Sequence, residues 1–339
     1  MPVDRAVLAV TGTPVLVLRA LGLGDALTAV PALRGLRRTY SGRDLLLAGR
    51  PEVSGWLRDQ GFADGVLPVD GLSAAPPGRL LGRHRAVNLH GRGPHSHRLL
   101  QAGRPEELVA FDCPPAGHAA PSRWRADEHE VRRWCRLLTE HGIPCDPADL
   151  RLDPPTGPVV PHGAIVIHPG AASRSRQWPP ARWAAVAAVL ATGSAAFGAA
   201  DPSPIVLTGG AAERGLCHTV ALAAGVACAD LSGRLGLDDL AAVVAHARLL
   251  LSGDTGVAHL ATAYGTPSVT LFGPTPPRHW GPLIDTERHI VVYAGAGTGD
   301  PHAAGPDPAL LRITVADVVS AARRAVRPVE PARRGTSPR

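Results

Sequence analysis

Short apolar runs that end at small-residue turns recur along this chain, and stretches with helical spacing follow them. A strand that is apolar throughout is buried on both faces, which is typical of a parallel sheet covered by helices. In the second half, the predicted strands and helices lie at residues 165–167, 181–190, 205–207, 213–224, 237–247, 249–251, from 255 onward, and 268–271. This order predicts a doubly wound parallel α/β domain.

The first half of the chain carries a weaker form of the same pattern. A predicted strand at residues 15–18 runs into a glycine turn, and the apolar residues after it have helical spacing. Pro31 must lie in the first turn of that helix, because proline has no backbone N–H to donate. Further strands are predicted at residues 45–47 and 86–89, with a helix at residues 128–141. The first half is therefore also predicted to be α/β.

The domain boundary is predicted from a proline-rich stretch. Residues 153–163 contain four prolines, which is typical of an exposed segment between domains, and 339 residues suit two domains. We predict an N-terminal domain over residues 1–155 and a C-terminal domain over residues 156–308. A last helix is expected at residues 309–326, followed by a disordered tail rich in Arg and Pro at residues 327–339.

The charge and the cysteines exclude several classes of function. The formal net charge is +6, and the last 17 residues alone carry +5 because they hold six arginines and one glutamate. The rest of the chain is close to neutral, so no nucleic-acid partner is expected. The five cysteines are never two residues apart, so neither a disulfide framework nor a zinc knuckle is expected.

No segment has the composition of a secretory signal or a membrane span. Charged residues and a proline interrupt the apolar stretches near the N-terminus. The most apolar window, residues 183–200, is rich in alanine and is broken by glycines, whereas a spanning helix requires ~20 strongly apolar residues. A cytoplasmic protein is expected.

Four strand-to-helix junctions are rich in small and polar residues. The first contains Gly22, Gly24 and Asp25, where glycines let the backbone approach a ligand and a carboxylate gains from the helix dipole. The simpler alternative is a turn with Asp25 as helix cap, because the third glycine of the dinucleotide fingerprint is missing. The second junction, residues 168–179, joins small residues with Arg176 and a second arginine. This combination suits a phosphate, although solvated arginines fit it equally well.

The other two junctions are ambiguous in the same way. The third, residues 208–213, ends in Glu213, which can accept hydrogen bonds from sugar hydroxyls or can cap its helix. The fourth places Asp254 and Thr255 at a helix start and His259 one turn further along, although a lone histidine on an apolar helix is usually a core residue. Because ligands bind at the carboxyl ends of parallel strands, we expect a site in the cleft between the domains.

Taken in order, these segments resemble glycosyltransferase family 9, the bacterial heptosyltransferases of lipopolysaccharide assembly and their relatives. The resemblance extends from about Val15 to Trp280. Its most specific parts are His168-Pro-Gly170 with Arg176-Gln-Trp178-Pro179, Leu207-Thr-Gly209-Gly210 with Glu213, Ser252-Gly-Asp254-Thr255-Gly256 with His259, and Gly265-Thr-Pro267 with Leu271-Phe-Gly273-Pro274-Thr275. The Leu-Gly-Asp ending at Asp25 and the run Asn88-Leu-His90-Gly91 fit the same family.

The resemblance implies the GT-B architecture, in which two Rossmann-like domains face a central cleft and the last helix returns to the N-terminal domain. It also implies an inverting, metal-independent sugar transfer from a nucleotide-sugar donor, ADP-heptose-like, to a hydroxyl of a glycan or lipid-linked acceptor, with no cofactor. Asp25 would be the general base. The implied donor contacts are Ala171, Ala172, Arg176, Glu213, Leu235, Asp254, Thr255, Gly256 and His259, and the implied acceptor-side residues are Arg19, Gly24, Asn88 and His90, with Arg19 balancing charge. A monomer is expected, and the basic tail suits contact with an anionic membrane surface, where a lipid-linked acceptor would lie.

The implied chemistry is consistent with the residues present. An acceptor hydroxyl must lose a proton during transfer, and Asp25 is the only strong candidate base in the first domain. Arginine and helix N-termini can stabilise the leaving diphosphate, and neither an Asp-x-Asp motif nor the spacing of the histidines in residues 84–97 predicts a metal site. Arg176 stands where the family usually has lysine, which keeps the charge but changes its geometry.

Three other functions are compatible with parts of the pattern. A nucleotide-sugar epimerase of the same fold would have similar phosphate loops but no acceptor pocket. A catalytically inactive homologue would bind a nucleotide sugar without turnover, although the joint presence of Asp25, Arg176, Glu213, Asp254 and His259 argues against it. A dinucleotide-dependent dehydrogenase is disfavoured because no Gly-x-Gly-x-x-Gly follows a predicted strand.

Overall fold

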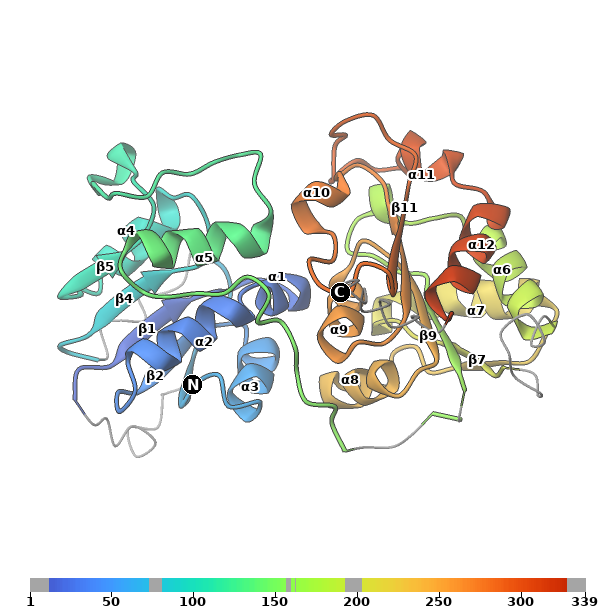
Figure 1. Ribbon diagram of the computed structural model, residues 1–339, viewed down its shortest axis with the longest axis horizontal. Coiled ribbons are helices and arrows are strands. Elements are labelled where there is room, and N and C mark those ends of the chain that lie inside the picture. Colours follow the sequence, from blue (N-terminus) through green and yellow to red (C-terminus); the bar gives the residue numbers. More distant parts are fainter. Residues whose placement is uncertain (1–11, 73–80, 157–159, 162, 193–202, 328–339) are drawn as a thin grey trace, which may run out of the picture.

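The computed structural model describes residues 12–72, 81–156, 160–161, 163–192 and 203–327. These residues form two α/β domains that lie side by side, the first coloured blue to green and the second yellow-green to red (Figure 1). The chain passes from one to the other between helix α5 (Glu130–Glu140) and strand β6 (Ile165–His168). The predicted proline-rich linker belongs to this stretch. Beyond Arg327, the predicted tail lies outside the described residues.

The first domain is built on a five-stranded parallel sheet with the order β3-β2-β1-β4-β5. The strands are β1 (Val15–Leu18), β2 (Leu45–Gly49), β3 (Gly65–Pro68), β4 (Arg85–Asn88) and β5 (Glu107–Val109). Val15 of β1 lies beside Leu45 of β2 and Arg85 of β4. Every side chain of β1 is buried, as expected for a central strand covered on both faces. The strands predicted near residues 15, 45 and 86 are therefore confirmed.

Helices cover both faces of this sheet. They are α1 (Leu23–Thr28), α2 (Val30–Thr39), α3 (Pro51–Asp59), α4 (His95–Gln101) and α5. Val17 packs in a cluster with Leu33 of α2 and Trp134 of α5, whereas Leu16 packs on the other face with Leu100 of α4. As predicted, Pro31 lies in a first turn, but the predicted single helix is two helices, α1 and α2.

The second domain is built on a six-stranded parallel sheet with the order β11-β10-β9-β6-β7-β8. The strands after β6 are β7 (Ile205–Leu207), β8 (Cys228–Asp230), β9 (Leu249–Gly253), β10 (Ser268–Phe272) and β11 (His289–Tyr293). Numbered within each domain, both sheets have the strand order 3-2-1-4-5, extended by a sixth strand in the second. The predicted pair of doubly wound, Rossmann-like parallel sheets is thus confirmed.

Seven α-helices belong to the described part of the second domain. They are α6 (Pro180–Thr192), α7 (Arg214–Ala224), α8 (Leu237–Ala245), α9 (Gly256–Tyr264), α10 (Pro277–Trp280), α11 (Pro308–Arg312) and α12 (Val315–Ala325). The short 3-10 helices η4 (Arg174–Arg176) and η6 (Ala211–Glu213) follow β6 and β7. The sequence pattern located α6 to α9, whereas α10 is a single turn too short to leave a helical period.

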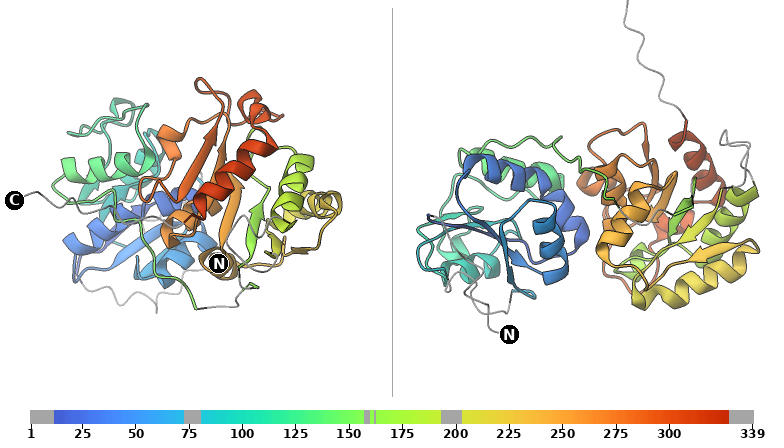
Figure 2. Two further views of the ribbon diagram at one scale, coloured as in Figure 1. Left: turned by 45° about the vertical axis from the view of Figure 1, so that its right-hand side comes forward. Right: turned by 90° about the horizontal axis from the view of Figure 1, so that it is seen from below.

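The last helix packs against the second domain. The resemblance had implied that this helix returns to the first domain, which is wrong. The region predicted as one helix at residues 309–326 is divided into α11 and α12, and the hydroxyl of Thr314 caps α12. Val318, Ala321 and Ala322 are fully buried in the cluster that also contains Trp183 of α6. Figure 2 (left) shows α12 in red lying across the second domain. Its apolar face covers β9 to β11, and this burial holds the helix in its own domain.

Two further findings concern the cysteines and the membrane. Cys135 of α5 and Cys145 form a disulfide, with their Cα atoms 5.1 Å apart, where the cysteine spacing had predicted no disulfide framework. The chain turns back after α5 and brings two cysteines ten positions apart together, which sequence spacing alone does not indicate. Among the described residues, no helix combines the length and the apolar character needed to cross a bilayer.

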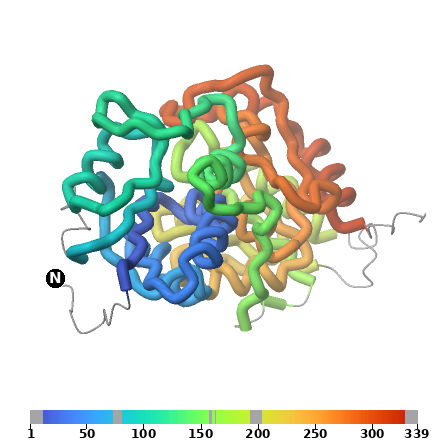
Figure 3. Tube along the Cα trace, turned by 60° about the vertical axis from the view of Figure 1, so that its left-hand side comes forward, coloured from blue at the N-terminus to red at the C-terminus, as the bar shows by residue number. Residues whose placement is uncertain are grey.

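The two domains touch through helices and through charged side chains. α1 packs against α9 and α3 against α8, so that one buried apolar cluster contains both Leu27 and Leu260. Asp127 Oδ1 of the first domain lies 2.8 Å from Arg278 Nε and 2.7 Å from His279 Nε2 of the second. Figure 3 shows the two halves with the first domain turned forward. This interface places the carboxyl ends of strands from both sheets around one cavity.

Candidate functional site

A cavity of about 440 Å³ lies between the two domains. Its walls come from the turns that follow β1, β6 and β9, together with residues after β10 and β11. The lining residues are Gly22, Leu23, Gly24, Asp25, Ala172, Arg176, Asp254, Thr255, Gly256, Val257, His259, Thr275, Trp280, Pro301 and His302. Eight of the sequence-predicted site residues are among them.

The topology explains why these turns converge. In the first sheet, β1 has β2 on one side and β4 on the other, so the connections leave in opposite directions. In the second sheet, β6 and β9 are the corresponding pair. A crevice opens at the carboxyl end of a sheet where the strand order reverses in this way, and both crevices face the cavity.

Asp25 lies in the first turn of α1, with its side chain 30% exposed. Arg19, at the end of β1, is only 5% exposed and donates from Nε and Nη2 to the main-chain oxygen of Asp25, at 3.0 and 2.8 Å. The shortest side-chain contact, from Arg19 Nη2 to Asp25 Oδ1, is longer, at 3.5 Å. Burial raises the pKa of Asp25, the Arg19 charge opposes this, and Glu130 adds to it.

Arg19 had been predicted as an acceptor-side residue, and its surroundings support only the charge-balancing part of that role. Its guanidinium also donates to the carbonyl of Leu89 and lies 3.1 Å from Glu130 Oε1. It is not among the residues that line the cavity. Arg19 therefore acts on the cavity through Asp25.

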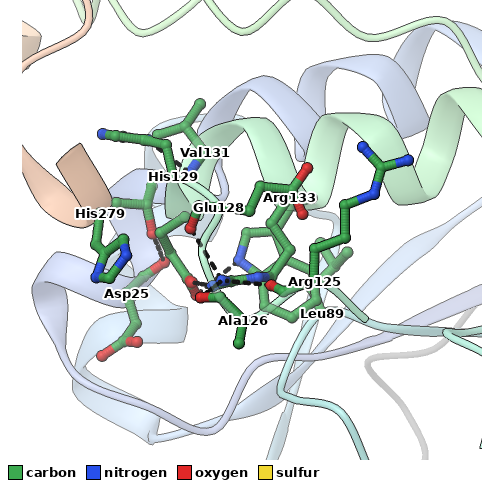
Figure 4. A network of polar contacts seen from close by, with 12 residues as sticks. Asp25, Leu89, Arg125, Ala126, Glu128, His129, Val131, Arg133 and His279 are labelled. Carbon is green, nitrogen blue, oxygen red and sulfur yellow. Dashed lines mark hydrogen bonds and ion pairs between the residues drawn. The ribbon is translucent and has the colours of Figure 1, made fainter. Parts of the chain in front are cut away.

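Glu130, in the first turn of α5, was not predicted from the sequence. Its Oε1 accepts a hydrogen bond from Trp134 Nε1 at 2.9 Å, and its Oε2 accepts from Arg133. Figure 4 shows Arg133 beside the main chain of residues 125–128, with the carboxylate of Asp25 pointing away from it. Glutamate is common in the first turn of a helix because it interacts favourably with the helix dipole. The sequence pattern therefore does not distinguish the buried Glu130 from an exposed glutamate at a helix start.

Arg176 and Asp254 form the charged part of the second wall. Arg176 Nη1 lies 3.3 Å from the main-chain oxygen of Asp254 and 3.9 Å from its Oδ2. Asp254 is 7% exposed, and burial raises its pKa to about 6, with Arg176 opposing and the negative charge of Asp25 adding to the rise. Arg176 Nε is buried and has no hydrogen-bond partner among the described residues. The Arg176 side chain as a whole lines the cavity and is 25% exposed, so its guanidinium can meet an anionic ligand there.

The start of α9 brings the second domain close to the first. Thr255 is its N-cap residue without a side-chain cap, and Gly256 begins the helix. A Cβ atom on Gly256 would lie 2.8 Å from the amide nitrogen of Gly24, and one on Gly24 would lie 3.1 Å from the His259 ring. Burial, together with the charge of His129, lowers the pKa of His259 to about 4, so this ring is neutral near pH 7. The close approach of α1 and α9 therefore requires glycine at position 256 and leaves little room for a side chain at position 24.

Glu213 caps its helix, which was one of the two roles that the sequence suggested for it. Its Oε2 accepts from the Gly210 amide at 2.7 Å and lies 3.9 Å from His168 Nε2. A side chain at Gly170 would collide with the Glu213 carboxylate, so the second and third junctions are in direct contact. Glu213 does not line the cavity, and its proposed role with donor hydroxyls stays a prediction.

The remaining predicted residues lie at different depths. Ala172 lines the cavity, whereas Ala171 is buried and its carbonyl accepts from Gln177. Leu235 packs partly buried in the turn before α8, away from the cavity lining, so its nucleoside contact stays a prediction.

Asn88 was predicted as an acceptor contact, but it is fully buried and so cannot reach a ligand. Its Oδ1 accepts from the His90 amide at 3.0 Å and its Nδ2 donates to Ser96 Oγ at 2.9 Å, which fixes the turn after β4. His90 Nδ1 accepts from the Ala20 amide at 3.2 Å, and burial lowers its pKa to about 4. These two residues support the wall that carries Asp25.

Several lining residues were missed by the sequence interpretation. Trp280 and Thr275 belong to the last matched segment, but neither had been assigned to the site. Pro301 and His302 come from the loop after β11, which Ser175 holds through a 2.7 Å hydrogen bond to the Pro301 carbonyl. A loop without periodic pattern gives no sequence signal for such a placement. In the part of the chain that the structure covers, no group of three or more His, Cys, Asp or Glu side chains is arranged to hold a metal ion.

Comparison with known proteins identifies the family. The model of glycosyltransferase family 9 (heptosyltransferase) matches residues 123–298, slightly more than half of the chain. Lipopolysaccharide heptosyltransferase 1 of Pseudomonas aeruginosa is 31% identical over 179 residues, which cover 51% of this chain and 47% of that protein. The alignments with this and another curated relative span no more than about half of those proteins' lengths.

Solved structures share the fold over nearly the whole chain. The ADP-heptose lipopolysaccharide heptosyltransferase II of Escherichia coli superposes with a TM-score of 0.73 at 18% identity, covering 93% of this chain and 98% of that one. A dodecameric iron-containing heptosyltransferase, TibC, in complex with ADP-D-β-D-heptose gives a TM-score of 0.58 at 15% identity, covering 93% of this chain and 76% of the other. The two-domain GT-B architecture is thereby confirmed.

Proposed function

Because this chain belongs to glycosyltransferase family 9, we propose that it transfers a heptose-like sugar from a nucleoside-diphosphate sugar to an acceptor hydroxyl, with inversion at the anomeric carbon. The observation that carries the proposal is the shared cavity, in which Asp25 of the first domain faces Arg176 and the start of α9 of the second. A carboxylate and a cationic, amide-rich wall on opposite sides suit an acceptor proton and a leaving diphosphate, respectively.

In this reaction the acceptor oxygen attacks the anomeric carbon while the bond from that carbon to the diphosphate oxygen breaks. The acceptor proton passes to the Asp25 carboxylate, whose partly buried position raises its pKa and so makes it a stronger base than a solvated aspartate. Arg19 holds the main chain of Asp25, and the partly buried carboxylate is left at the cavity.

The leaving diphosphate would be bound by the second wall. Its negative charge grows as the bond breaks, and the Arg176 guanidinium in the cavity lining and the amides at the start of α9 can donate to it. Ala172 brings further backbone close to the same place without a bulky side chain. This arrangement can neutralise the leaving group without a divalent cation, so we propose a metal-independent reaction without a cofactor.

Donor and acceptor follow from the relatives. The names of the similar proteins point to ADP-heptose as donor and to a lipopolysaccharide-type glycan as acceptor. Such an acceptor is lipid-linked, so the protein would act at the cytoplasmic face of the membrane, and we propose that it does so as a monomer. A membrane-proximal acceptor also gives a use to the basic residues of the tail.

The test is whether ADP is released from ADP-D-β-D-heptose only when heptose-free lipopolysaccharide is added. Acceptor-dependent release with a glycosylated product supports the transfer, whereas interconversion of the donor without acceptor would indicate an epimerase. Binding of ADP-heptose without any turnover would indicate an inactive homologue. A thermal-shift panel of nucleoside diphosphates would identify the base, since a ligand at 100 times its Kd adds about 2.7 kcal/mol.

A further inference from the structure

A buried carboxylate lies behind Asp25, on the side away from the cavity. Glu130 is 5% exposed and is held by Arg19, Arg133 and Trp134, which come from β1 and from its own helix. Burying a carboxylate is costly unless charged partners and hydrogen bonds compensate it. An apolar residue would fill the same place at lower cost, so the charge of Glu130 calls for a reason beyond packing.

The geometry of Arg19 supplies that reason. Its short contacts go to the main-chain oxygens of Asp25 and Leu89, to the hydroxyl of Thr28 and to the carboxylate of Glu130. Its contact with the Asp25 carboxylate is at the outer limit of a hydrogen bond, at 3.5 Å. Without Glu130, only the carboxylate of Asp25 would lie near the Arg19 guanidinium. A tight ion pair with Asp25 would then be the one charged contact left to Arg19.

We propose that Glu130 is a positioning residue for the base: it holds the Arg19 guanidinium on the main chain of Asp25 and keeps it from pairing tightly with the Asp25 carboxylate. This inference rests on the proposed function, because it concerns how Asp25 accepts the proton. A base that is locked in an ion pair is both misdirected and weakened. Glu130 thereby keeps Asp25 aimed at the acceptor and strongly basic.

Other charged groups also face this site and have to be considered. Those around Asp25 are Arg19, Glu130, Asp254, Arg176, His259 and His90. His129 and Arg133 lie beside Glu130 in the first domain. Burial lowers the pKa of His259 and of His90 to about 4, so both rings stay neutral above pH 5. Asp254, with its pKa raised to about 6, titrates in the working range, so effects on Asp25 must be measured against a matched control.

Glu130→Gln tests the inference, because it keeps the shape and removes the charge. Turnover of ADP-D-β-D-heptose with heptose-free lipopolysaccharide is expected to fall about 10-fold, while the Kd of the donor changes less than about twofold. Loss of a negative charge lowers the pKa of Asp25, so the acid limb of the pH–rate profile should move to lower pH by about half a unit to one unit. Glu130→Asp restores the charge and should leave the acid limb in place.

Glu128→Gln is the matched control. Glu128 lies two positions earlier and is bound at 2.7 Å by Arg136, without any contact to Arg19. Its substitution removes an equally paired carboxylate and should leave turnover and pH profile unchanged. The inference is overturned if Glu130→Gln folds and behaves as the wild type, or if Glu128→Gln shifts the profile as much.

Two outcomes need separate readouts. If Glu130→Gln does not fold, Trp134→Phe decides, because it removes the indole N–H that binds Glu130 Oε1 together with part of the ring that packs against the Arg19 guanidinium. About a threefold loss of turnover is then expected, and wild-type turnover would overturn the inference. If Asp25→Asn itself keeps full turnover, the proposed function fails. If Asp25→Asn is inactive while Glu130→Gln is unchanged, only the positioning role fails.

Discussion

The two walls of the cavity are built in different ways. The first-domain wall depends on buried charged side chains, with Asp25 in front and Arg19 and Glu130 behind it. The second-domain wall consists mainly of small residues and backbone at the starts of η4 and α9, with Arg176 and Asp254 as its charged pair. A proton acceptor is tuned by the charges around it, whereas a diphosphate is bound by many donors that must come close. Each wall has the composition that its part of the proposed reaction requires.

The largest effect should come from the first wall. Asp25→Asn is expected to lower turnover by ~10²–10⁴, because a general base acts only as the acceptor proton is transferred. The thermal shift produced by ADP-heptose should remain close to that of the wild type, since the proposed donor site lies on the other wall. If turnover is unchanged, Asp25 is only a helix cap, and the proposed assignment of the proton acceptor to the first wall fails.

Arg176→Ala probes the second wall. Loss of a charge-assisted hydrogen bond of roughly 1.5–3 kcal/mol should weaken ADP binding about 10- to 100-fold. Adenosine, which has no phosphate, should bind the variant and the wild type about equally well, as isothermal titration can measure. Equal losses for both ligands would place Arg176 outside the phosphate site.

A smaller effect should follow pH through Asp254. Its pKa is raised to about 6, so this carboxyl is neutral below that pH and negative above it. The diphosphate of ADP-heptose is charged throughout, so the donor affinity should fall about three- to tenfold from pH 5 to pH 7.5. His259, with its pKa near 4, does not titrate in this range. Asp254→Asn should flatten the profile, and an unchanged slope would assign it to another group.

The smallest expected effect is that of a chelator. If Arg176 and the start of α9 neutralise the leaving diphosphate, turnover should persist in excess EDTA. Loss of activity that magnesium or manganese restores would contradict the metal-independent reaction. Restoration by iron alone would instead align this chain with its iron-containing structural neighbour.

The sequence predicted the residues of the second wall more completely than those of the first. Motifs such as Ser252-Gly-Asp254 and Gly170 are local, because a strand end, a glycine turn and a helix start follow one another in the chain. The first wall depends on contacts between distant positions: Arg19 and Glu130 are 111 residues apart, and Asn88 forms hydrogen bonds beneath the surface. No periodic pattern records such pairs.

The prediction of where the last helix packs was wrong for a related reason. Its amphipathic face shows that α12 packs on something but not on which sheet, and the resemblance supplied the wrong partner. The sequence pattern predicts that a face is buried, whereas the identity of the covering surface is a property of the whole fold.

The contact between Gly24 and Gly256 has a mechanical consequence. Where Gly24 meets Gly256, no side chain separates α1 from α9, so backbone meets backbone. In the proposed reaction, this contact sets the gap between the proton acceptor and the departing phosphate. A side chain at position 256 would push the two helices apart and would lengthen the path of the acceptor oxygen to the anomeric carbon. Residues that contribute no functional group would thus govern the distance over which the proposed reaction takes place.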